Sequence, residues 1–346
     1  MYQAGNPDGH NAMCCWLSCF LIAFLPRFVP IHMEPSPTSV SNNSRRRDGI
    51  FVPKPSDSFV VTPAVERVTQ RAMTYLDAGY PVHLTGVSGT GKTSLAFHIA
   101  ALLERPAVLL HGDSEFSRSD LVGGEVGYRK SKVVDNFIRS VLKTSEQVHK
   151  VWEDKRLAQA CREGHTLIYD EFNRSRPEAN NVLLSILEER ILNLPTRGGQ
   201  SDGYVRVHPN FRAIFTSNTK EYAGTHSMQS ALLDRMITIK LEYPDEDTEV
   251  QITKTRSGID EARAKRIVGL VRHVRDRLDD YHGPSVRGSV VIARVFAERV
   301  EDITPTSAFF RDVCLDVLRP ARATGDSDRE AHARQVIVDA IDEMYT

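Results

Sequence analysis

The stretch of sequence that decides the fold is GVSGTGKT, residues 86–93. It matches the pattern G-x-x-x-x-G-K-[ST] at every fixed position. A short apolar run, PVHLT (81–85), precedes it, and SLAFHIAALL (94–103) follows it with helical character. A glycine loop between a strand and a helix is the context in which this motif binds nucleotide phosphates. The sequence therefore predicts an α/β fold with a phosphate-binding loop, or P-loop.

Each residue type in this loop has a physical role. The glycines let backbone N–H groups turn toward phosphate oxygens without a Cβ in the way. Lys92 can reach the β- and γ-phosphates, and the Thr93 hydroxyl can ligate Mg²⁺. The positive end of the following helix faces the same anion. We therefore predict ATP and Mg²⁺ as cofactors, with the nucleotide bound by Gly86, Val87, Ser88, Gly89, Thr90, Gly91, Lys92, Thr93 and Ser94.

A second apolar run ends in two acidic residues. TLIYDEF (166–172) has strand character as far as Asp170 and Glu171. Such a pair on its own fits a solvated strand end equally well, but the P-loop upstream favours a catalytic role. We predict that Asp170 holds Mg²⁺ through a water molecule and that Glu171 is the general base for the attacking water.

A third predicted strand, FRAIFTSN (211–218), ends in the polar residue Asn218. The carboxyl ends of neighbouring parallel strands face the same crevice. Asn218 is therefore predicted to orient the attacking water beside Glu171. The alternative is that Asn218 only caps the next turn.

These motifs, together with ALLDRM (231–236), resemble the AAA+ ATPases. The resemblance implies ATP hydrolysis within a homo-oligomeric ring, which we expect to be a hexamer. It also implies that Arg235 is an arginine finger that reaches the γ-phosphate bound by a neighbouring subunit. The alternative is a surface cation at the carboxyl end of a helix.

The segment DEFNRSRPEANNVLLSILEER (170–190) is similar to the MoxR branch of AAA+ proteins. This resemblance places Arg174 and Arg176 near the subunit interface. It also implies two inserted hairpins, one around KVVDNFIRSV (132–141) and one at ILNLPTRGGQSDGYVRV (191–207). After the first hairpin, we expect a long helical stretch over residues 144–164.

Beyond residue 243 the pattern changes to helices with dense charge. Residues 259–281 place apolar side chains on one helical face, and further helices are expected at 290–300, 311–321 and 328–345. The AAA+ resemblance implies a small all-α lid domain here, in which Arg287 occupies the sensor 2 position over the γ-phosphate. The alternative is a solvated arginine at a helix start.

The predicted domain organisation follows from these changes in pattern. The fold class is α/β, an AAA+ core with a parallel sheet flanked by helices, followed by the helical lid. We expect an unstructured tail at 1–50, the nucleotide-binding domain at 51–243, the lid at 244–322, and a linker with a last helix at 323–346.

The amino-terminal segment contains the apolar run MCCWLSCFLIAFL (13–25). It is shorter than the ~20 residues that a spanning helix needs, no Lys or Arg precedes it, and no cleavage site follows it. We expect neither a membrane span nor a signal peptide. The alternatives are a docked or interfacial helix, or a translation start at Met33 that would exclude this segment.

Composition restricts the partners and the compartment. The chain has 44 Lys and Arg against 45 Asp and Glu, a formal net charge of −1, so no global field attracts nucleic acid or an anionic membrane. Cys14, Cys15 and Cys19 crowd into the apolar run, whereas Cys161 and Cys314 are expected to be buried, reduced thiols of a cytoplasmic protein.

Within the MoxR branch, residues 57–320 resemble the gas vesicle protein N family, most clearly at 57–100 and 157–195. The resemblance implies a cytoplasmic ATPase and chaperone for gas vesicle assembly, associated with vesicles and with shell and assembly proteins as partners. The alternative in the same branch is an activator of a carbon-fixing or nitrogen-oxide-reducing enzyme, working with a von Willebrand-type protein. A nucleic-acid motor is disfavoured by the neutral charge, and a pure ATP switch by Glu171.

Overall fold

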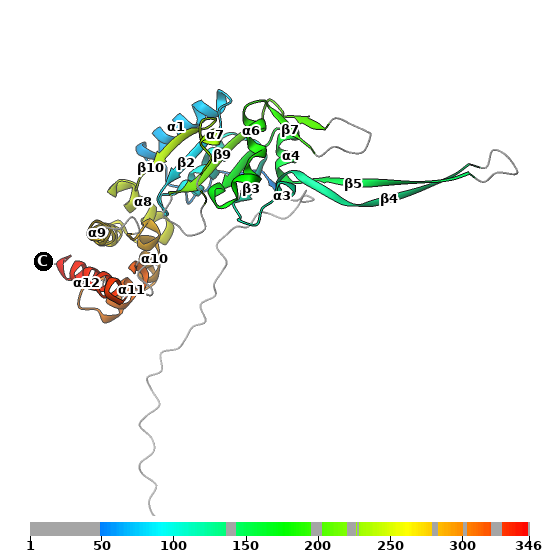
Figure 1. The fold of residues 1–346 in the computed structure, drawn as a ribbon. Coiled ribbons are helices and arrows are strands. Elements are labelled where there is room, and N and C mark those ends of the chain that lie inside the picture. Colours follow the sequence, from blue (N-terminus) through cyan, green and yellow to red (C-terminus); the bar gives the residue numbers. More distant parts are fainter. Residues whose placement is uncertain are drawn as a thin grey trace, which may run out of the picture. The chain divides into compact units, whose positions relative to one another are not determined.

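The computed structural model describes residues 49–135, 143–194, 203–219, 226, 228–278, 283–299, 303–319 and 327–344 (Figure 1). The apolar run 13–25 and its three cysteines lie outside these residues. Within the described part, no helix is both long enough and apolar enough to cross a membrane. Cys161 and Cys314 are buried free thiols, as predicted, and burial raises the pKa of each to about 12.

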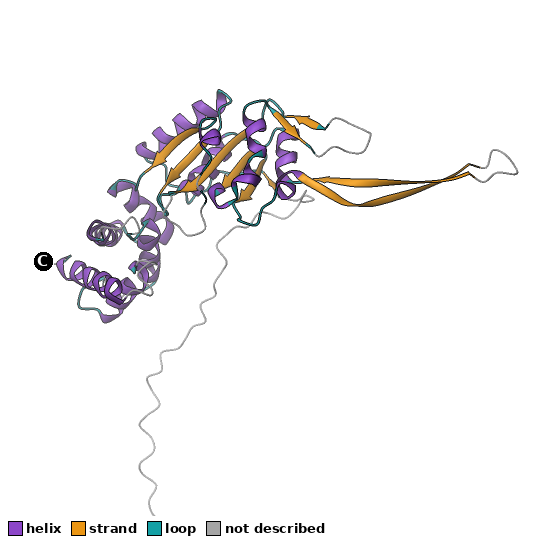
Figure 2. Ribbon diagram, in the orientation of Figure 1, coloured by secondary structure: helices purple, strands orange, loops and turns teal. Residues whose placement is uncertain are grey.

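A six-stranded sheet with the order β1-β3-β6-β9-β2-β10 forms the α/β region (Figure 2). The strands are β1 (Ile50–Phe51), β2 (Val82–Gly86), β3 (Ala107–His111), β6 (Thr166–Asp170), β9 (Arg212–Asn218) and β10 (Ile237–Leu241). Every neighbouring pair is parallel except β1 and β3, which are antiparallel. The predicted parallel sheet is confirmed, with one short antiparallel strand added at its edge.

The central strands are buried on both faces, which explains their nearly continuous apolar sequence. On β6, Leu167 and Tyr169 belong to one hydrophobic cluster, whereas Ile168 belongs to another. On β9, Phe215 belongs to the first cluster and Ile214 to the second. Because successive strand side chains point to opposite faces, the sheet separates two cores.

Helices supply the other side of each core. Residues of α1 and α2 join the Ile168 cluster, and residues of α4 and α6 join the Tyr169 cluster. The helices of this region are α1 (Pro63–Asp77), α2 (Lys92–Leu102), α3 (Arg118–Val122), α4 (Arg156–Glu163), the 3₁₀ helix η1 (Phe172–Arg174), α5 (Pro177–Asn180), α6 (Val182–Leu187) and α7 (Ser230–Leu233). Thr62 caps α1 by accepting the N–H of Val65, with Pro63 at the first helical position.

The prediction of a helix over 144–164 is wrong in its first half. Lys143–Asp154 forms β5, which pairs antiparallel with β4 (Gly123–Asp135), and only α4 is helical. Val148, Val151 and Trp152 have a spacing that also fits a helix, but Val148 pairs with Lys130 of β4. Local spacing carries no information about a partner strand that lies far away in the sequence.

Both hairpins that the family resemblance implied have paired strands. The first is β4 with β5, and its residues 136–142 lie outside the described part. The second is β7 (Ile191–Asn193) with β8 (Tyr204–Arg206), and its residues 195–202 lie outside it. The two expected insertions are therefore confirmed as hairpins at the level of their strands.

The carboxyl-terminal region is helical, as predicted. Its helices are α8 (Glu246–Ser257), α9 (Glu261–Arg277), α10 (Val286–Ala297), α11 (Ala308–Leu318) and α12 (Ser327–Glu343). One hydrophobic cluster contains Leu270 and Val274 of α9, Phe296 of α10, Phe310 of α11 and Ile337 of α12. The last helix therefore packs into the same core as the helices before it.

Candidate nucleotide site

The P-loop connects β2 to α2, as the motif predicts. Gly89 has φ 83° and Gly91 has φ 85°, a left-handed conformation that residues with a side chain rarely adopt. Gly91 is also the N-cap of α2, and its carbonyl accepts the N–H of Leu95 at 2.8 Å. The loop backbone therefore turns at the positive end of an 11-residue helix, which favours an anion.

Lys92 is the cation of this loop. Its side chain is buried, and Nζ donates to the carbonyl oxygens of Gly86 at 3.0 Å and Val87 at 2.6 Å. Burial lowers the pKa of Lys92 to about 8, while the negative charges of Glu171 and Asp170 act in the opposite direction. The ammonium group is therefore held at the loop, in a low-dielectric environment where attraction to phosphate is strong.

Asp170 lies at the end of β6 and joins three elements. Its Oδ1 accepts hydrogen bonds from Thr93 Oγ1 at 2.7 Å and Thr216 Oγ1 at 2.5 Å. Its Oδ2 lies 3.6 Å from Nδ1 of His111, the paired residue at the end of β3. The two residues predicted as Mg²⁺ ligands, Thr93 and Asp170, therefore lie in direct contact.

Glu171 follows in a left-handed backbone conformation, with φ 52°. Its N–H donates to Thr216 Oγ1 at 2.9 Å. Its carboxylate accepts a hydrogen bond from Asn218 Nδ2 at 3.1 Å on Oε1 and forms an ion pair with Arg174 at 2.9 Å on Oε2. A non-glycine residue in this conformation is uncommon, and here the tip of β9 and η1 both hold it.

The other cations of the sequence prediction have different surroundings. Arg235 lies just after α7, where its guanidinium pairs with Glu188 and NH1 donates to the carbonyl of Ala231 at 2.5 Å. Arg176 is exposed at the N-cap of α5. Arg287 is exposed at the start of α10, and its N–H donates to Ser285 Oγ at 3.3 Å.

Three contributors were missed by the sequence analysis. Thr216 binds both Asp170 and the N–H of Glu171, and a hydroxyl two residues before the end of a buried strand was the signal for it. His111 comes from the end of β3, a strand that no motif marked. Ser285 packs so closely on Gly89 that a Cβ at residue 89 would overlap its side chain.

The residues present fit a Mg²⁺-nucleotide. The Thr93 hydroxyl and the Asp170 carboxylate are oxygen ligands of the kind that Mg²⁺ takes from protein beside phosphates and water. Apart from the chain immediately around Gly91, no atom of the described residues lies within 4 Å of the position that a Cβ of residue 91 would take, so this side of the loop is open. A phosphate could approach the loop N–H groups there, beside Lys92.

Comparison with known proteins agrees with this geometry. A family model described as AAA domain (dynein-related subfamily) matches residues 81–236, the stretch from β2 to the end of the ALLDRM segment. The gas vesicle ATPase GvpN of Ancylobacter aquaticus is 46% identical over 299 residues, covering 86% of this chain and 83% of that protein. GvpN1 of Halobacterium salinarum is 42% identical, covering 87% and 85%. The chain belongs to the GvpN family of gas vesicle ATPases.

Membership of the GvpN family adds an activity to the site geometry described above. As a GvpN-family AAA+ protein, the chain binds a nucleotide and hydrolyses ATP. Protein NorQ of Paracoccus denitrificans is a further relative, 27% identical, and the match covers 56% of this chain and 64% of that protein. The similarity to GvpN proteins is both higher and more extensive.

Proposed function

We propose that this chain is a Mg²⁺-ATP-dependent remodelling ATPase that acts as a chaperone in gas vesicle assembly. The observation that carries the catalytic part is the meeting of two strand ends at the P-loop. Asp170 lies against Thr93, and Glu171 lies against Asn218, which itself pairs in register with Gly86 of the loop. The proposed metal ligands, and the proposed base with its orienting amide, thus lie side by side at one edge of the sheet.

Each group has a defined task in hydrolysis. The P-loop N–H groups and Lys92 bind the phosphates, and Thr93 and Asp170 hold the metal. Mg²⁺, when bound, neutralises charge on the phosphate oxygens. Glu171 accepts the proton of the attacking water, and Asn218 fixes the carboxylate at 3.1 Å so that the water is bound in one orientation.

A ring of identical subunits would complete the site. We propose a hexamer in which Arg235 reaches the γ-phosphate of the neighbouring subunit and so couples hydrolysis to assembly. In the single chain this half-buried guanidinium pairs with the exposed Glu188, a partner that a more strongly charged phosphate could replace. Arg287 would report the nucleotide state to the helices that follow it, and we place the boundary between core and lid at residues 243–244.

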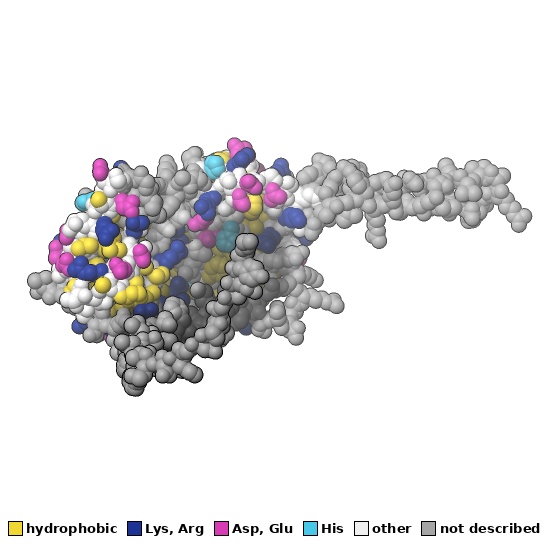
Figure 3. Space-filling view, turned by 90° about the horizontal axis from the view of Figure 1, so that it is seen from below, with side chains coloured by type: hydrophobic (Ala, Val, Ile, Leu, Met, Phe, Trp, Pro, Cys, Tyr) yellow, Lys and Arg dark blue, Asp and Glu magenta, His cyan; other side chains and the backbone are white. Residues whose placement is uncertain are grey.

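The proposed partners and location rest on the family. The GvpN relatives are named as gas vesicle ATPases, and we propose that this chain is cytoplasmic and remodels gas vesicle shell or assembly proteins. On the face shown in Figure 3, basic side chains lie among acidic ones. On this face, such a mixture of charges favours a protein partner over nucleic acid, because nucleic acid binds to a contiguous basic surface.

The test is a capture experiment with Glu171→Gln. This change removes the base but leaves Asp170 and Thr93, so the variant is expected to bind ATP, stop turnover and retain its substrate. Purification from the native host in ATP, followed by mass spectrometry, should recover gas vesicle shell or assembly proteins, and Lys92→Ala should not retain them. Recovery of a metabolic enzyme with a von Willebrand-type protein would instead identify an activator, the alternative that the sequence analysis left open.

A further inference from the structure

A buried carboxylate joins the first two helices of the carboxyl-terminal region. Glu249 of α8 is fully buried, and two arginines of α9 compensate its charge. Arg275 NH1 lies 2.7 Å from Oε1 and NH2 lies 3.3 Å from Oε2, whereas Arg272 NH1 lies 3.3 Å from Oε1. An unpaired carboxylate at this depth would be strongly unfavourable, so at least one of the arginines is required for the fold.

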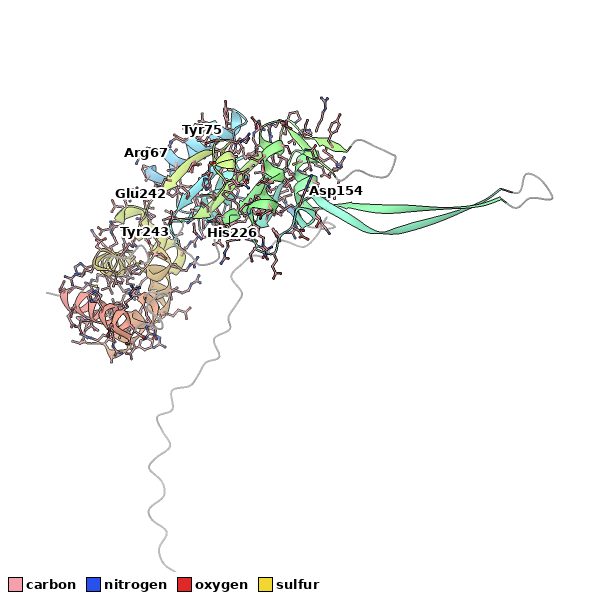
Figure 4. All side chains as sticks on the ribbon, viewed as in Figure 1. Arg67, Tyr75, Asp154, His226, Glu242 and Tyr243 are labelled. Carbon is pink, nitrogen blue, oxygen red and sulfur yellow. The ribbon has the colours of Figure 1, made fainter. Side chains whose placement is uncertain are left out.

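Arg275 makes two further contacts that Arg272 does not make. Its Nε donates to the carbonyl of Pro284 at 2.7 Å, and its guanidinium carbon lies 4.1 Å from the ring centroid of Tyr243. Tyr243 lies where the chain passes from β10 toward α8 (Figure 4). Only a planar guanidinium with several donors can bind a carboxylate, a carbonyl and an aromatic face together.

Pro284 directly precedes a residue that contacts the P-loop. Pro284 precedes Ser285, the N-cap of α10, whose Oγ accepts the N–H of Arg287 at 3.3 Å. The Ser285 side chain packs on Gly89 of the P-loop, which has room for it only because residue 89 lacks a Cβ. A displacement of Pro284 would therefore move both Ser285 at the P-loop and the start of the helix that carries Arg287.

We propose that Arg275 is a positioning residue for ATP binding, which acts by fixing Pro284 and, through it, Ser285 and Arg287 at the P-loop. The buried pair with Glu249 anchors the guanidinium, and its Nε transmits that position to the Pro284 carbonyl. This inference rests on the proposed role of Arg287 in contacting nucleotide. It assigns to a residue of α9, outside every sequence motif, a part in nucleotide affinity.

The test compares two matched variants, Arg275→Lys and Arg272→Lys, in the full-length protein. Both keep a positive charge near Glu249. Arg275→Lys loses the hydrogen bond to the Pro284 carbonyl, whereas Arg272→Lys loses the hydrogen bond from Arg272 NH1 to the Pro244 carbonyl at 3.2 Å. Titration with a fluorescent ATP analogue should show about tenfold weaker binding for Arg275→Lys, the effect of about one hydrogen bond to a positioned group, and less than a twofold change for Arg272→Lys. Equal losses in both variants, or none in Arg275→Lys, would overturn the inference.

A double-variant cycle separates positioning from general destabilisation. If Arg275 acts through Arg287, Arg275→Lys should cost much less affinity in an Arg287→Ala background than in the wild-type chain. Additive losses would contradict the inference, whereas an Arg287→Ala variant with unchanged ATP binding would contradict the proposed function of Arg287 itself.

Ser285→Gly, which leaves the buried cluster intact, should also weaken ATP binding, and this variant decides the matter if Arg275→Lys does not fold.

Discussion

Asn218 donates a hydrogen bond from Nδ2 to Oε1 of Glu171 at 3.1 Å, so the end of β9 fixes the carboxylate that follows β6. The backbone of the two strands cannot vary this distance freely, because β6 and β9 are paired up to Tyr169 and Phe215. The orientation of the proposed base is therefore determined by the sheet and by one amide side chain.

Replacing this amide should slow the chemical step more than it weakens binding. For Asn218→Ala we expect kcat for ATP hydrolysis to fall roughly 10²-fold, since a misplaced base costs rate without removing phosphate contacts. The KM for ATP should stay within a few-fold of the wild-type value. Steady-state hydrolysis assays check this, with Asn218→Asp as a second variant that lacks the donor. A variant that hydrolyses ATP at the normal rate would show that Asn218 has no part in the mechanism.

The site could be predicted from sequence where its chemistry is encoded in contiguous residues. The P-loop and the Asp170–Glu171 pair each follow a strand within a few positions, and strand pairing brings them together at one edge of the sheet. Thr216 and His111 could not be predicted in the same way, because their roles depend on β9 and β3 flanking β6 in the sheet. Strand order is a property of tertiary packing, which local patterns do not contain.

The absence of information about distant partners in local sequence patterns also explains why the helix predicted over residues 144–164 is wrong in its first half. Lys143–Asp154 has the composition of a charged helix, but its backbone hydrogen bonds are made to β4. The outcome is decided by tertiary structure, because the strand that pairs with Lys143–Asp154 comes from another part of the chain. Arg174 pairs with Glu171 of its own chain at 2.9 Å, and its place near a subunit interface stays a prediction.

Arg235 is expected to act on a neighbouring subunit. Arg235→Ala should reduce ATP hydrolysis on the order of 10³-fold, the usual effect of losing a finger in trans, while Glu188→Gln, which removes only the partner within the chain, should leave hydrolysis intact. Mixing Arg235→Ala with Lys92→Ala chains should restore part of the activity, because mixed rings contain sites with one intact P-loop and one intact finger. If the mixed chains form rings but hydrolysis is not restored, Arg235 acts within its own subunit.

The lowered pKa of Lys92 predicts proton uptake when ATP binds. Burial lowers this pKa to about 8, so a fraction of the chains lacks the proton at pH 8, and the phosphate charges of ATP raise the pKa again. Binding at pH 8 should take up about half a proton at this group, and binding at pH 6.5 none, since Lys92 is then already charged. Calorimetry in buffers of different ionisation enthalpy measures the uptake. Lys92→Arg, which stays charged, should abolish it, and the same uptake in that variant would trace the proton to another group.

His83 should make the fold sensitive to mild acid. It lies on β2, three residues before Gly86 of the P-loop, and is almost fully buried, with Nε2 2.8 Å from Ser217 Oγ and Nδ1 3.0 Å from Thr238 Oγ1. Burial lowers its pKa to about 4, whereas an unfolded chain takes up the proton near pH 6.5. The stabilisation is therefore complete above pH 6.5 and is lost as the pH falls toward 4, which amounts to about 2 kcal/mol of unfolding free energy between pH 7.5 and 5.

His83→Gln separates this contribution from the carboxylates, which also titrate in acid. The amide can still bond to Ser217 or Thr238 but carries no titrating proton, so the variant should lose less stability between pH 7.5 and 5 than the wild-type chain. Urea unfolding at the two pH values gives both free energies. Equal losses of unfolding free energy in the variant and the wild-type chain would mean that His83 accepts its proton without disturbing β2. A smaller loss of unfolding free energy in the variant would mean that β2, which leads into the P-loop, is stabilised by a neutral histidine. Protonated His83 has no ring lone pair, so one of its two hydroxyl partners would lose the acceptor to which it donates.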